Sequence, residues 1–397
     1  MTKRLERGTR WALVGATMLL AACGTARGPQ LAPPVSVDGV DALAVGSGVA
    51  IAFNDAYRER IDLNEPRARK NPKNTDKALL RLIKTSRTSI SGAFYDIEDL
   101  GVTEALVAAC RRGVKVRLVT DTDNMVEKHD PAKPREAIQL LGASGVRVVD
   151  DRRSGIMHHK FMVVDGQTLW TGSTNLTPTS LYRHNNNALT IRNRRLAHAF
   201  EDEFERLFER REFGKSSRGE TQPTDEIPLG SGMTVQAFFS PGGNGRAAVV
   251  REVRDAKRSI RFMTFSLTDV ETGDALVERA KAGVKVEGVF DRWLAAGQYS
   301  LFDRFKAAKL EVRKDGNEAL MHHKVIVVDN DTVITGSYNY SQNAEHNNNE
   351  AFLIFRHARS VAGAFADEYE RLRQAAIVNR PPPHKADDAE KKTGEGP

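Results

Sequence analysis

A duplicated polar motif constrains the fold of this 397-residue chain more than any other sequence feature. Each copy consists of His-x-Lys, four residues, Asp, six residues and Gly-Ser-x-Asn, and the copies occupy residues 158–175 and 322–339. Both copies follow a Met and precede a His-Asn-Asn-Asn segment, at 184–187 and 346–349. This agreement is too extensive for chance. It indicates an internal duplication and therefore a molecule built from two similar halves.

The residue types in the motif suit chemistry on a phosphodiester. A catalyst must neutralise the non-bridging oxygens while it presents a nucleophile to phosphorus and a proton to the leaving oxygen. Histidine can serve as the nucleophile or as the acid near neutral pH, so the duplication supplies one residue for each task through His158 and His322. The remaining positions supply positive charge and hydrogen bonds: Lys160, Lys324, Ser173, Ser337, Asn175 and Asn339.

The paired motifs resemble those of the phospholipase D superfamily, whose members cleave or transfer phosphodiesters through a phosphohistidine without a metal. The resemblance covers about residues 47–375, and it implies that His158, Lys160, His322 and Lys324 are catalytic. It also implies one active site between the repeats and no cofactor. Because both motifs are in one chain, a monomer is plausible, although the sequence leaves the oligomeric state open. The segments 239–243, 260–269 and 283–286 further resemble the branch of small endonucleases and mitochondrial cardiolipin hydrolases, which leaves the substrate open.

The duplication extends beyond the motif. Residues 90–99 parallel 260–269, and the Gly-Val-Lys-Val segments at 113 and 283 are also 170 positions apart, whereas the motif histidines are 164 apart. Repeat one therefore has six extra residues before its motif. The segment 120–134, rich in Asp, Lys and Pro, is predicted to hold them as a loop.

The pattern within each repeat predicts an α/β fold with a mixed or largely parallel sheet flanked by helices. Helices are predicted at 75–85, 102–112, 195–211 and 357–374, and strands at 89–95, 115–120, 160–164 and 325–328. The predicted organisation is a lipoprotein signal at 1–23, a tether at 24–46, repeat one at 47–213, a linker at 214–232, repeat two at 233–376 and a disordered tail at 377–397.

The N-terminus indicates the compartment. Four basic residues precede an apolar run at 11–22 that is too short to span a bilayer, so it is predicted to be a signal segment. The sequence Leu-Ala-Ala-Cys ending at Cys23 resembles a bacterial lipobox, which implies that Cys23 is lipidated. With Gly24 following, that resemblance implies anchoring in the outer membrane, facing the periplasm of a bacterial cell.

Charge and motif completeness bear on the choice of function. The 55 basic and 51 acidic residues after Cys23 give a net charge of +4, weaker than a dedicated nucleic-acid binder requires. Together with the predicted lipid anchor, this mild charge favours phospholipid as the substrate. The alternatives are a periplasmic endonuclease, with nucleic acid as substrate, and a phosphatidyl transferase of the cardiolipin-synthase type. A catalytically inactive binding module is disfavoured because both motifs are complete.

Several residues near the motif have structural interpretations. His159 and His323 should point away from the catalytic face, because side chains alternate along a strand. Asp165 and Asp329 are predicted to fix the turns after their strands rather than to touch substrate. Trp293 lies in the loop after a predicted strand, where either substrate contact or packing is equally consistent with the sequence.

One difference between the repeats predicts separate roles for the histidines. Aligning residues 188–189 with 351–352 places Glu350 opposite Asn187. A carboxylate stabilises imidazolium, so if Glu350 supports His322 of its own repeat, His322 is the general acid and His158 the nucleophile. The superfamily resemblance implies the same assignment.

Overall fold

A computed structural model describes residues 43–46, 48–54, 69–217 and 221–377. Cys23, the predicted signal, most of the predicted tether and nearly all of the predicted tail lie outside these residues. Within them, no helix combines the length and hydrophobicity needed to cross a membrane.

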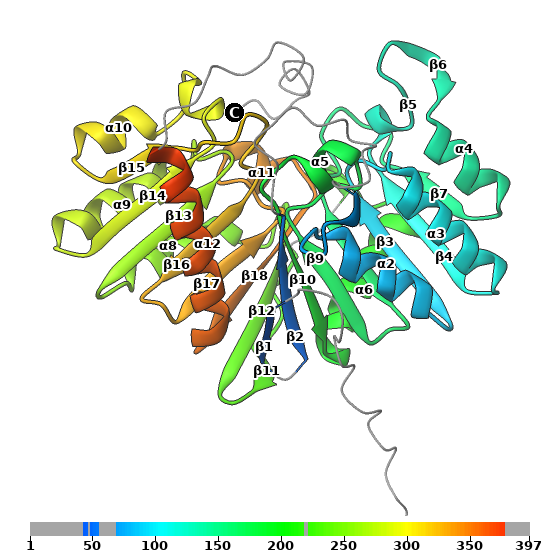
Figure 1. Cartoon of the computed structure of the whole chain (residues 1–397), viewed down its shortest axis with the longest axis horizontal. Helices are drawn as coiled ribbons and strands as arrows, with labels where there is room; N and C mark the ends of the chain where they lie inside the picture. Colours follow the sequence, from blue (N-terminus) through cyan, green and yellow to red (C-terminus); the bar gives the residue numbers. More distant parts are fainter. Residues whose placement is uncertain (1–42, 47, 55–68, 218–220, 378–397) are drawn as a thin grey trace, which may run out of the picture. The chain divides into compact units, whose positions relative to one another are not determined.

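Two eight-stranded sheets form the centre of the described molecule (Figure 1). The first has the order β1-β2-β10-β9-β8-β3-β4-β7, and the second has the matching order β11-β12-β18-β17-β16-β13-β14-β15. The strands of the first are β1 Leu43–Gly46, β2 Val49–Phe53, β3 Ser89–Phe94, β4 Lys115–Thr120, β7 Arg147–Asp150, β8 Lys160–Val164, β9 Thr168–Gly172 and β10 Asn187–Arg192. Those of the second are β11 Ile227–Gly230, β12 Met233–Ser240, β13 Ser259–Thr264, β14 Lys285–Phe290, β15 Glu311–Lys314, β16 Lys324–Val328, β17 Thr332–Gly336 and β18 Glu350–Arg356.

Both sheets are mixed, as the sequence predicted. In each, three strands at one edge are parallel (β3, β4 and β7; β13, β14 and β15), and the other pairs are antiparallel. The α/β fold with two repeats is therefore confirmed, but antiparallel pairs outnumber parallel ones, so the largely parallel alternative is wrong.

Helices flank both sheets (Figure 1). Those of the first half are α2 Asp76–Thr85, α3 Leu100–Arg111, α4 Glu136–Ala143, α5 Pro178–Tyr182 and α6 Arg194–Phe208. Those that follow are α7 Gly214–Ser217, α8 Gly245–Arg254, α9 Val270–Lys281, α10 Phe302–Ala307, α11 Gln342–His346 and α12 Arg359–Ile377. The caps explain their ends: Asp99 accepts a hydrogen bond from the Val102 N–H at the start of α3, and Gly113, with φ of 89°, follows its end.

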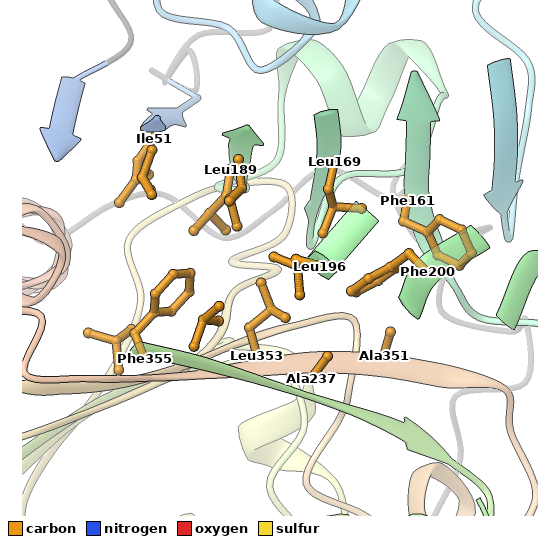
Figure 2. Packing of buried hydrophobic residues seen from close by; sticks show 14 of the residues in the cluster. Ile51, Phe161, Leu169, Leu189, Leu196, Phe200, Ala237, Ala351, Leu353 and Phe355 are labelled. Atoms are coloured by element: carbon orange, nitrogen blue, oxygen red, sulfur yellow. The ribbon is translucent and has the colours of Figure 1, made fainter. Parts of the chain in front are cut away.

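The two halves share one hydrophobic core between their sheets (Figure 2). Strand β8 sends Phe161 and Val163 into this core, and its alternate residues pack into a separate core beneath α2, α3 and α4. Strand β16 sends Val325 and Val327 into the shared core, and its alternate residues pack into a separate core of the second half. Burial on both faces explains why these strands are continuously apolar in the sequence.

Three segments that the sequence analysis treated as irregular contain strands. The predicted loop 120–134 contains a short hairpin, β5 Val126–Glu127 and β6 Asp130–Pro134. Strand β11 lies inside the predicted linker and pairs with β12, and β1 lies at the end of the predicted tether and pairs with β2. Their alternation was too short to recognise, because each strand contributes only two to five residues and depends on its partner for stability.

Candidate active site

Each His-x-Lys triplet lies where a central strand of its sheet begins. Lys160 begins β8 and Lys324 begins β16, so each catalytic candidate histidine lies just before a buried strand. The preceding methionine is held by a buried carboxylate: Asp121 accepts from the Met157 N–H at 2.8 Å, and Asp291 accepts from the Met321 N–H at 3.0 Å. These two aspartates, which follow β4 and β14, were not recognised from the sequence.

Burial raises the pKa values of the two aspartates, so both are weaker acids than usual. Burial and then the charge of Asp151 raise the pKa of Asp121 to about 7, and burial raises the pKa of Asp291 to about 6. The hydrogen bonds from the backbone oppose this shift without cancelling it.

The two halves cross over at the site. The His158 N–H donates to the Asn349 carbonyl at 2.9 Å, and the Asn349 N–H donates back to Ile156 at 3.0 Å. In the same way the His322 N–H donates to Asn185 at 2.9 Å. The His-Asn-Asn-Asn segment of each repeat is therefore bridged to the His-x-Lys entrance of the other repeat, which brings the two motifs together.

The crossing places Glu350 against His158. The Nδ1 atom of His158 lies 2.8 and 2.7 Å from the two carboxylate oxygens, and both side chains are fully buried. Ser337 donates its hydroxyl to the same carboxylate at 2.7 Å. The prediction that Glu350 supports His322 within its own repeat is therefore wrong, because the segment that carries Glu350 crosses to the other half.

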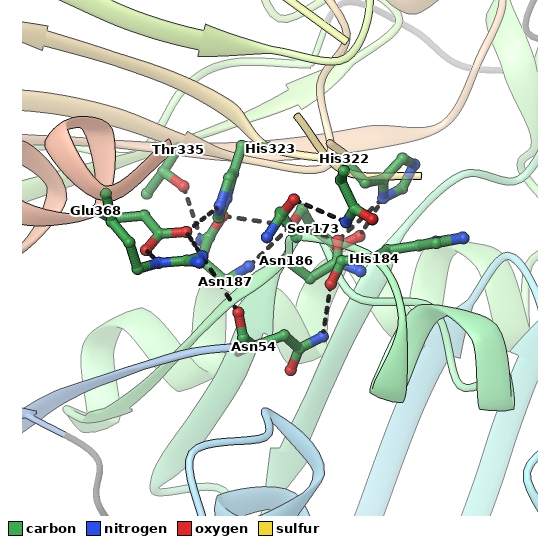
Figure 3. A network of polar contacts seen from close by, with 12 residues as sticks. Asn54, Ser173, His184, Asn186, Asn187, His322, His323, Thr335 and Glu368 are labelled. Carbon is green, nitrogen blue, oxygen red and sulfur yellow. Dashed lines mark hydrogen bonds and ion pairs between the residues drawn. The ribbon is translucent and has the colours of Figure 1, made fainter. Parts of the chain in front are cut away.

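The counterpart of Glu350 is Asn186, one residue before the position that the sequence alignment assigned. Asn186 accepts a hydrogen bond from Ser173 Oγ at 2.8 Å, just as Glu350 accepts one from Ser337. Asn186 and Glu350 are 164 positions apart, and so are Ser173 and Ser337 and the two motif histidines. Asn187 instead lies behind the site, where its Oδ1 accepts a hydrogen bond from His323 Nδ1 at 3.0 Å (Figure 3).

His322 has neutral partners. Its Nδ1 lies 3.0 Å from both the Ser173 carbonyl and Asn186 Oδ1 (Figure 3). A carbonyl can only accept, so Nδ1 carries the proton and the lone pair of the neutral ring lies on Nε2. Burial, and then the charges of Lys324 and Lys160, hold the pKa of His322 well below its usual value. The influence of a lysine from the other repeat agrees with the convergence of the two motifs.

The two lysines have equivalent, buried environments. Lys160 Nζ donates to the His158 carbonyl and Lys324 Nζ to the His322 carbonyl, each at 3.0 Å. Lys160 lies over the ring of Tyr95 and Lys324 over that of Phe265, at 5.4 and 4.6 Å from the ring centres. The rings also contact the catalytic candidate histidines edge-on. Each half thus presents one cation beside one imidazole.

The serines and asparagines of the motif divide between two positions. Ser173 and Ser337 orient the side chains that bind the histidines, as described above, so their hydroxyls are already engaged. Asn175 lines the cavity beside His322, where a phosphate oxygen could reach it. Asn339 is its buried equivalent in the second repeat.

Asp165 and Asp329 hold strands together rather than face the site. Asp165 accepts from the backbone N–H groups of residues 87–89, at 2.7 to 3.1 Å, and Asp329 accepts from those of 257–259. Although burial alone would raise the pKa of each carboxyl, these donors lower it. Both residues have φ of 53°, in the left-handed region. The structural interpretation of the two aspartates agrees with this geometry.

The middle histidines also point away from the reacting groups. His159 Nε2 lies 2.9 Å from Glu203 of α6, and His323 Nε2 lies 3.0 Å from Glu368 of α12. Burial lowers the pKa of His323 despite the opposing effect of Glu368. These pairs attach the last helix of each repeat to its His-x-Lys motif, and Figure 3 shows the His323–Glu368 pair.

A cavity of about 330 Å³ opens beside His322. Its apolar walls come mainly from the second repeat, and residues of both repeats supply its polar groups. The apolar side chains are Tyr95, Phe265, Leu267, Phe290, Trp293, Leu294, Tyr299 and Leu320. Trp293 therefore lines the site, and it also donates its ring N–H to Ala319. His184, the first residue of the His-Asn-Asn-Asn segment, lies in the same wall, with its ring centre 6.0 Å from that of His322.

The described part of the chain contains no cluster of three or more His, Cys, Asp or Glu side chains placed to hold a metal ion. The chemistry available from the residues in view is that of two imidazoles, two ammonium groups and a carboxylate. This combination suits attack on a phosphorus centre by one ring and proton transfer by the other.

Comparison with known proteins agrees with the family resemblance of the two motifs. A family model described as "Cardiolipin synthase, PLD-like domain" matches residues 79–208 and 249–373. Mitochondrial cardiolipin hydrolase of Xenopus laevis is 36% identical over 138 residues, which are 34% of this chain and 63% of that protein. Phospholipase D of Rickettsia typhi is 30% identical over 128 residues, which are 32% of this chain and 63% of that protein. The match thus spans less than two thirds of either relative.

A solved structure extends the likeness to both halves. Phosphatidylserine synthase of Haemophilus influenzae superposes with a TM-score of 0.61 and 12% identity, covering 86% of this chain and 92% of that one. At this identity the superposition shows a shared fold.

Proposed function

Because this chain belongs to the phospholipase D superfamily, we propose that it is a metal-independent phosphodiesterase that hydrolyses phospholipids at the head group through a phosphohistidine. The observation that carries the proposal is the crossing of the two repeats, which brings both His-x-Lys motifs to one site. A single motif would supply only one of the two imidazoles that the reaction needs.

The partner of each ring supports a separate role for each histidine. In the first step Nε2 of His158 attacks phosphorus and the bond to the leaving oxygen breaks, which makes a phosphoimidazolium. That positive charge persists for the life of the intermediate, and Glu350 lies within 2.8 Å of Nδ1 to compensate it. The carboxylate therefore favours His158 as the nucleophile, for a different reason than the sequence analysis gave.

His322 is then the proton carrier. Its pKa is low in the free protein, and the negative charge of a bound phosphodiester would raise it and favour imidazolium. Imidazolium donates its proton to the leaving alkoxide, and the neutral ring next accepts a proton from the water that breaks the phosphorus–nitrogen bond. Lys160 and Lys324 stabilise the non-bridging oxygens throughout.

The identity of the nucleophile can be tested by trapping. The His322→Asn protein, given a diester with an acidic leaving group, should accumulate a phosphoryl adduct on His158, detected by mass spectrometry of the peptide. An adduct on His322 in the His158→Asn protein, with none in the reciprocal variant, would reverse the assignment.

The apolar cavity beside His322 supports lipid as the substrate, because a lipid can bury apolar surface there. The experiment is to give the detergent-solubilised chain mixed phospholipids, single-stranded DNA or double-stranded DNA, each in EDTA. Release of head groups without DNA cleavage is the expected result. DNA cleavage without a lipid product would establish the endonuclease alternative, and exchange of head groups with an added alcohol would establish the transferase.

We also propose that lipidated Cys23 anchors the protein in the bacterial envelope, since a diacyl chain gives stable attachment. Cys23→Ser should release the protein from the membrane fraction or leave it unprocessed, without changing turnover of a soluble diester. Wild-type protein found entirely in the soluble periplasmic fraction would contradict the anchor.

A further inference from the structure

Arg153 lies at the point where the first repeat crosses to the second. It belongs to the irregular segment between β7 and β8, five residues before His158. Its guanidinium donates to the carbonyls of Asn347 and Ile156, at 2.8 and 2.9 Å, and to Asn349 Oδ1 at 2.7 Å. Asp151 pairs with its Nε at 3.1 Å. One planar group thus ties the entrance of the first motif to the segment that carries Glu350.

Asn317 makes the same three contacts in the other half with a different functional group. Its Nδ2 lies 2.9 Å from the Arg183 carbonyl, 2.8 Å from Asn185 Oδ1 and 3.2 Å from the Leu320 carbonyl. All three acceptors, and Asn317 itself, are 164 positions from their counterparts in the Arg153 cluster. Arg153 and Asn317 therefore occupy equivalent positions in the two halves, although their side chains differ.

Each cluster borders the partner of one histidine. Asn349, held by Arg153, precedes Glu350, the partner of His158. Asn185, held by Asn317, precedes Asn186, the partner of His322. Both clusters act on crossed segments that pair through isolated bridges rather than through a continuous strand ladder. Side-chain hydrogen bonds are therefore important for fixing the register of these crossed segments.

We propose that Arg153 and Asn317 are positioning residues, the first aligning Glu350 with His158 and the second aligning Asn186 with His322. The proposal rests on the proposed function for its kinetic consequences. Its structural consequence, the geometry of the His158–Glu350 pair, does not depend on activity. A displacement of about 1 Å at a reacting group can lower a rate by about 100-fold, so loss of either tie should have a measurable effect.

The two ties should affect different steps. With bis(4-nitrophenyl) phosphate, attack by His158 expels nitrophenolate with the bonding electron pair, and this leaving group needs no proton. Arg153→Ala should therefore slow the first-turnover burst of nitrophenolate by about 10- to 100-fold. Asn317→Ala should mainly slow the later steady state, where His322 must accept a proton from water.

Matched variants separate positioning from charge and from folding. Arg152→Ala removes a neighbouring, largely exposed arginine and should leave both phases unchanged. Arg153→Lys keeps the charge, but a single nitrogen cannot reach all three acceptors, so it should show most of the burst defect. Arg153 also borders a cavity of about 550 Å³, through which added guanidinium can reach the vacated position. Guanidinium should restore the burst of Arg153→Ala and not the steady state of Asn317→Ala.

A second measurement is independent of turnover. In full-length protein with nitrogen-15-labelled histidine, the His158 Nδ1 proton bonded to Glu350 should give a resonance that Arg153→Ala shifts or broadens and Asn317→Ala preserves. An unchanged resonance in Arg153→Ala, or equal loss of both kinetic phases in the two variants, would overturn the proposal. If the wild-type protein cleaves no diester, the proposed function fails, and the resonance alone decides the positioning role.

Discussion

His158 and His322 occupy equivalent places in the two repeats, but their Nδ1 partners differ in charge. His158 faces the carboxylate of Glu350, and His322 faces an amide and a backbone carbonyl. The motifs themselves are nearly identical, so the difference comes from the crossed segments. A duplication can therefore create two distinct functional groups by changing one residue in the segment that each half lends to the other.

The cavity shows a second asymmetry. It borders His322, and its wall includes Phe290 at the end of β14 and Trp293, Leu294 and Tyr299 from the loop that follows. The corresponding loop of the first repeat, after β4, contains the β5–β6 hairpin and contributes only Asn124 and Lys128. Under the proposed roles, the cavity lies on the side of the proton donor, and so on the side of the leaving group.

The largest effect is expected when either of the two compared histidines is removed. His158→Ala and His322→Ala should each lower diesterase turnover by about 1,000-fold or more, because the rings act as one unit. Lys160→Ala and Lys324→Ala should come close to this loss. Activity should persist in EDTA. Retention of turnover in one histidine variant, measured with phospholipid vesicles, would show that a single motif suffices.

A smaller effect should come from exchanging the charges of the two partners. Glu350→Gln should lower turnover by about 100-fold, because the phosphoimidazolium loses its compensating charge. Asn186→Asp should instead raise the pKa of His322 and move the alkaline limb of the pH–rate profile upward.

Asn186→Asp also carries a structural cost that must be measured separately. Asn186 Nδ2 donates to the Ser180 carbonyl at 2.9 Å, and a carboxylate cannot replace that bond, so we expect a loss of about 1–3 kcal/mol in unfolding free energy. Urea unfolding provides the control. An unshifted pH profile in a folded Asn186→Asp protein would show that this position does not set the acidity of His322.

The smallest effect concerns stability and compares Asp121 with Asp291. A carboxyl with a raised pKa keeps a proton in the folded protein that the unfolded chain releases, so its contribution to stability falls as pH rises from about 4 to the folded pKa. For Asp121 that range ends near pH 7, and for Asp291 near pH 6.

The matching variants remove this dependence. Asp121→Asn keeps one oxygen for the Met157 N–H and should gain stability relative to wild type as the pH rises from about 4 to 8. Asp291→Asn should gain less and level off earlier. Parallel unfolding curves across this range, measured in urea at each pH, would contradict the raised pKa values.

Much of each half was predictable from local patterns. The strands β3, β4 and β8 agree with their predicted ranges to within one residue, because short apolar runs between turn signals are typical of buried strands. The helix predicted at 102–112 is α3, and Gly113 follows its end with a positive φ. The hairpin strands β1 and β11 were missed, since only pairing with β2 and β12 makes them strands.

The position of Glu350 shows where pattern reasoning failed. Two apolar strands were aligned by similar residue pairs, and apolar strands tolerate a shift of one position in sequence comparison. The polar residues carried the correct spacing. Ser173 and Ser337 are 164 positions apart, as are Asn186 and Glu350, and this equals the separation of the motif histidines. That signal was present in the sequence and identifies Asn186 without the structure.

The sequence by itself determined the duplication, the identity of both His-x-Lys motifs and the α/β character of each half, because these depend on residue type and on spacing along the chain. Only the tertiary structure decided that Glu350 binds His158, that Asn186 binds His322, and that the cavity lies beside His322. The two side-chain pairings depend on hydrogen bonds between residues 192 and 136 positions apart. Nothing local fixes which half such a segment joins, and the crossing follows from packing both sheets around one shared core.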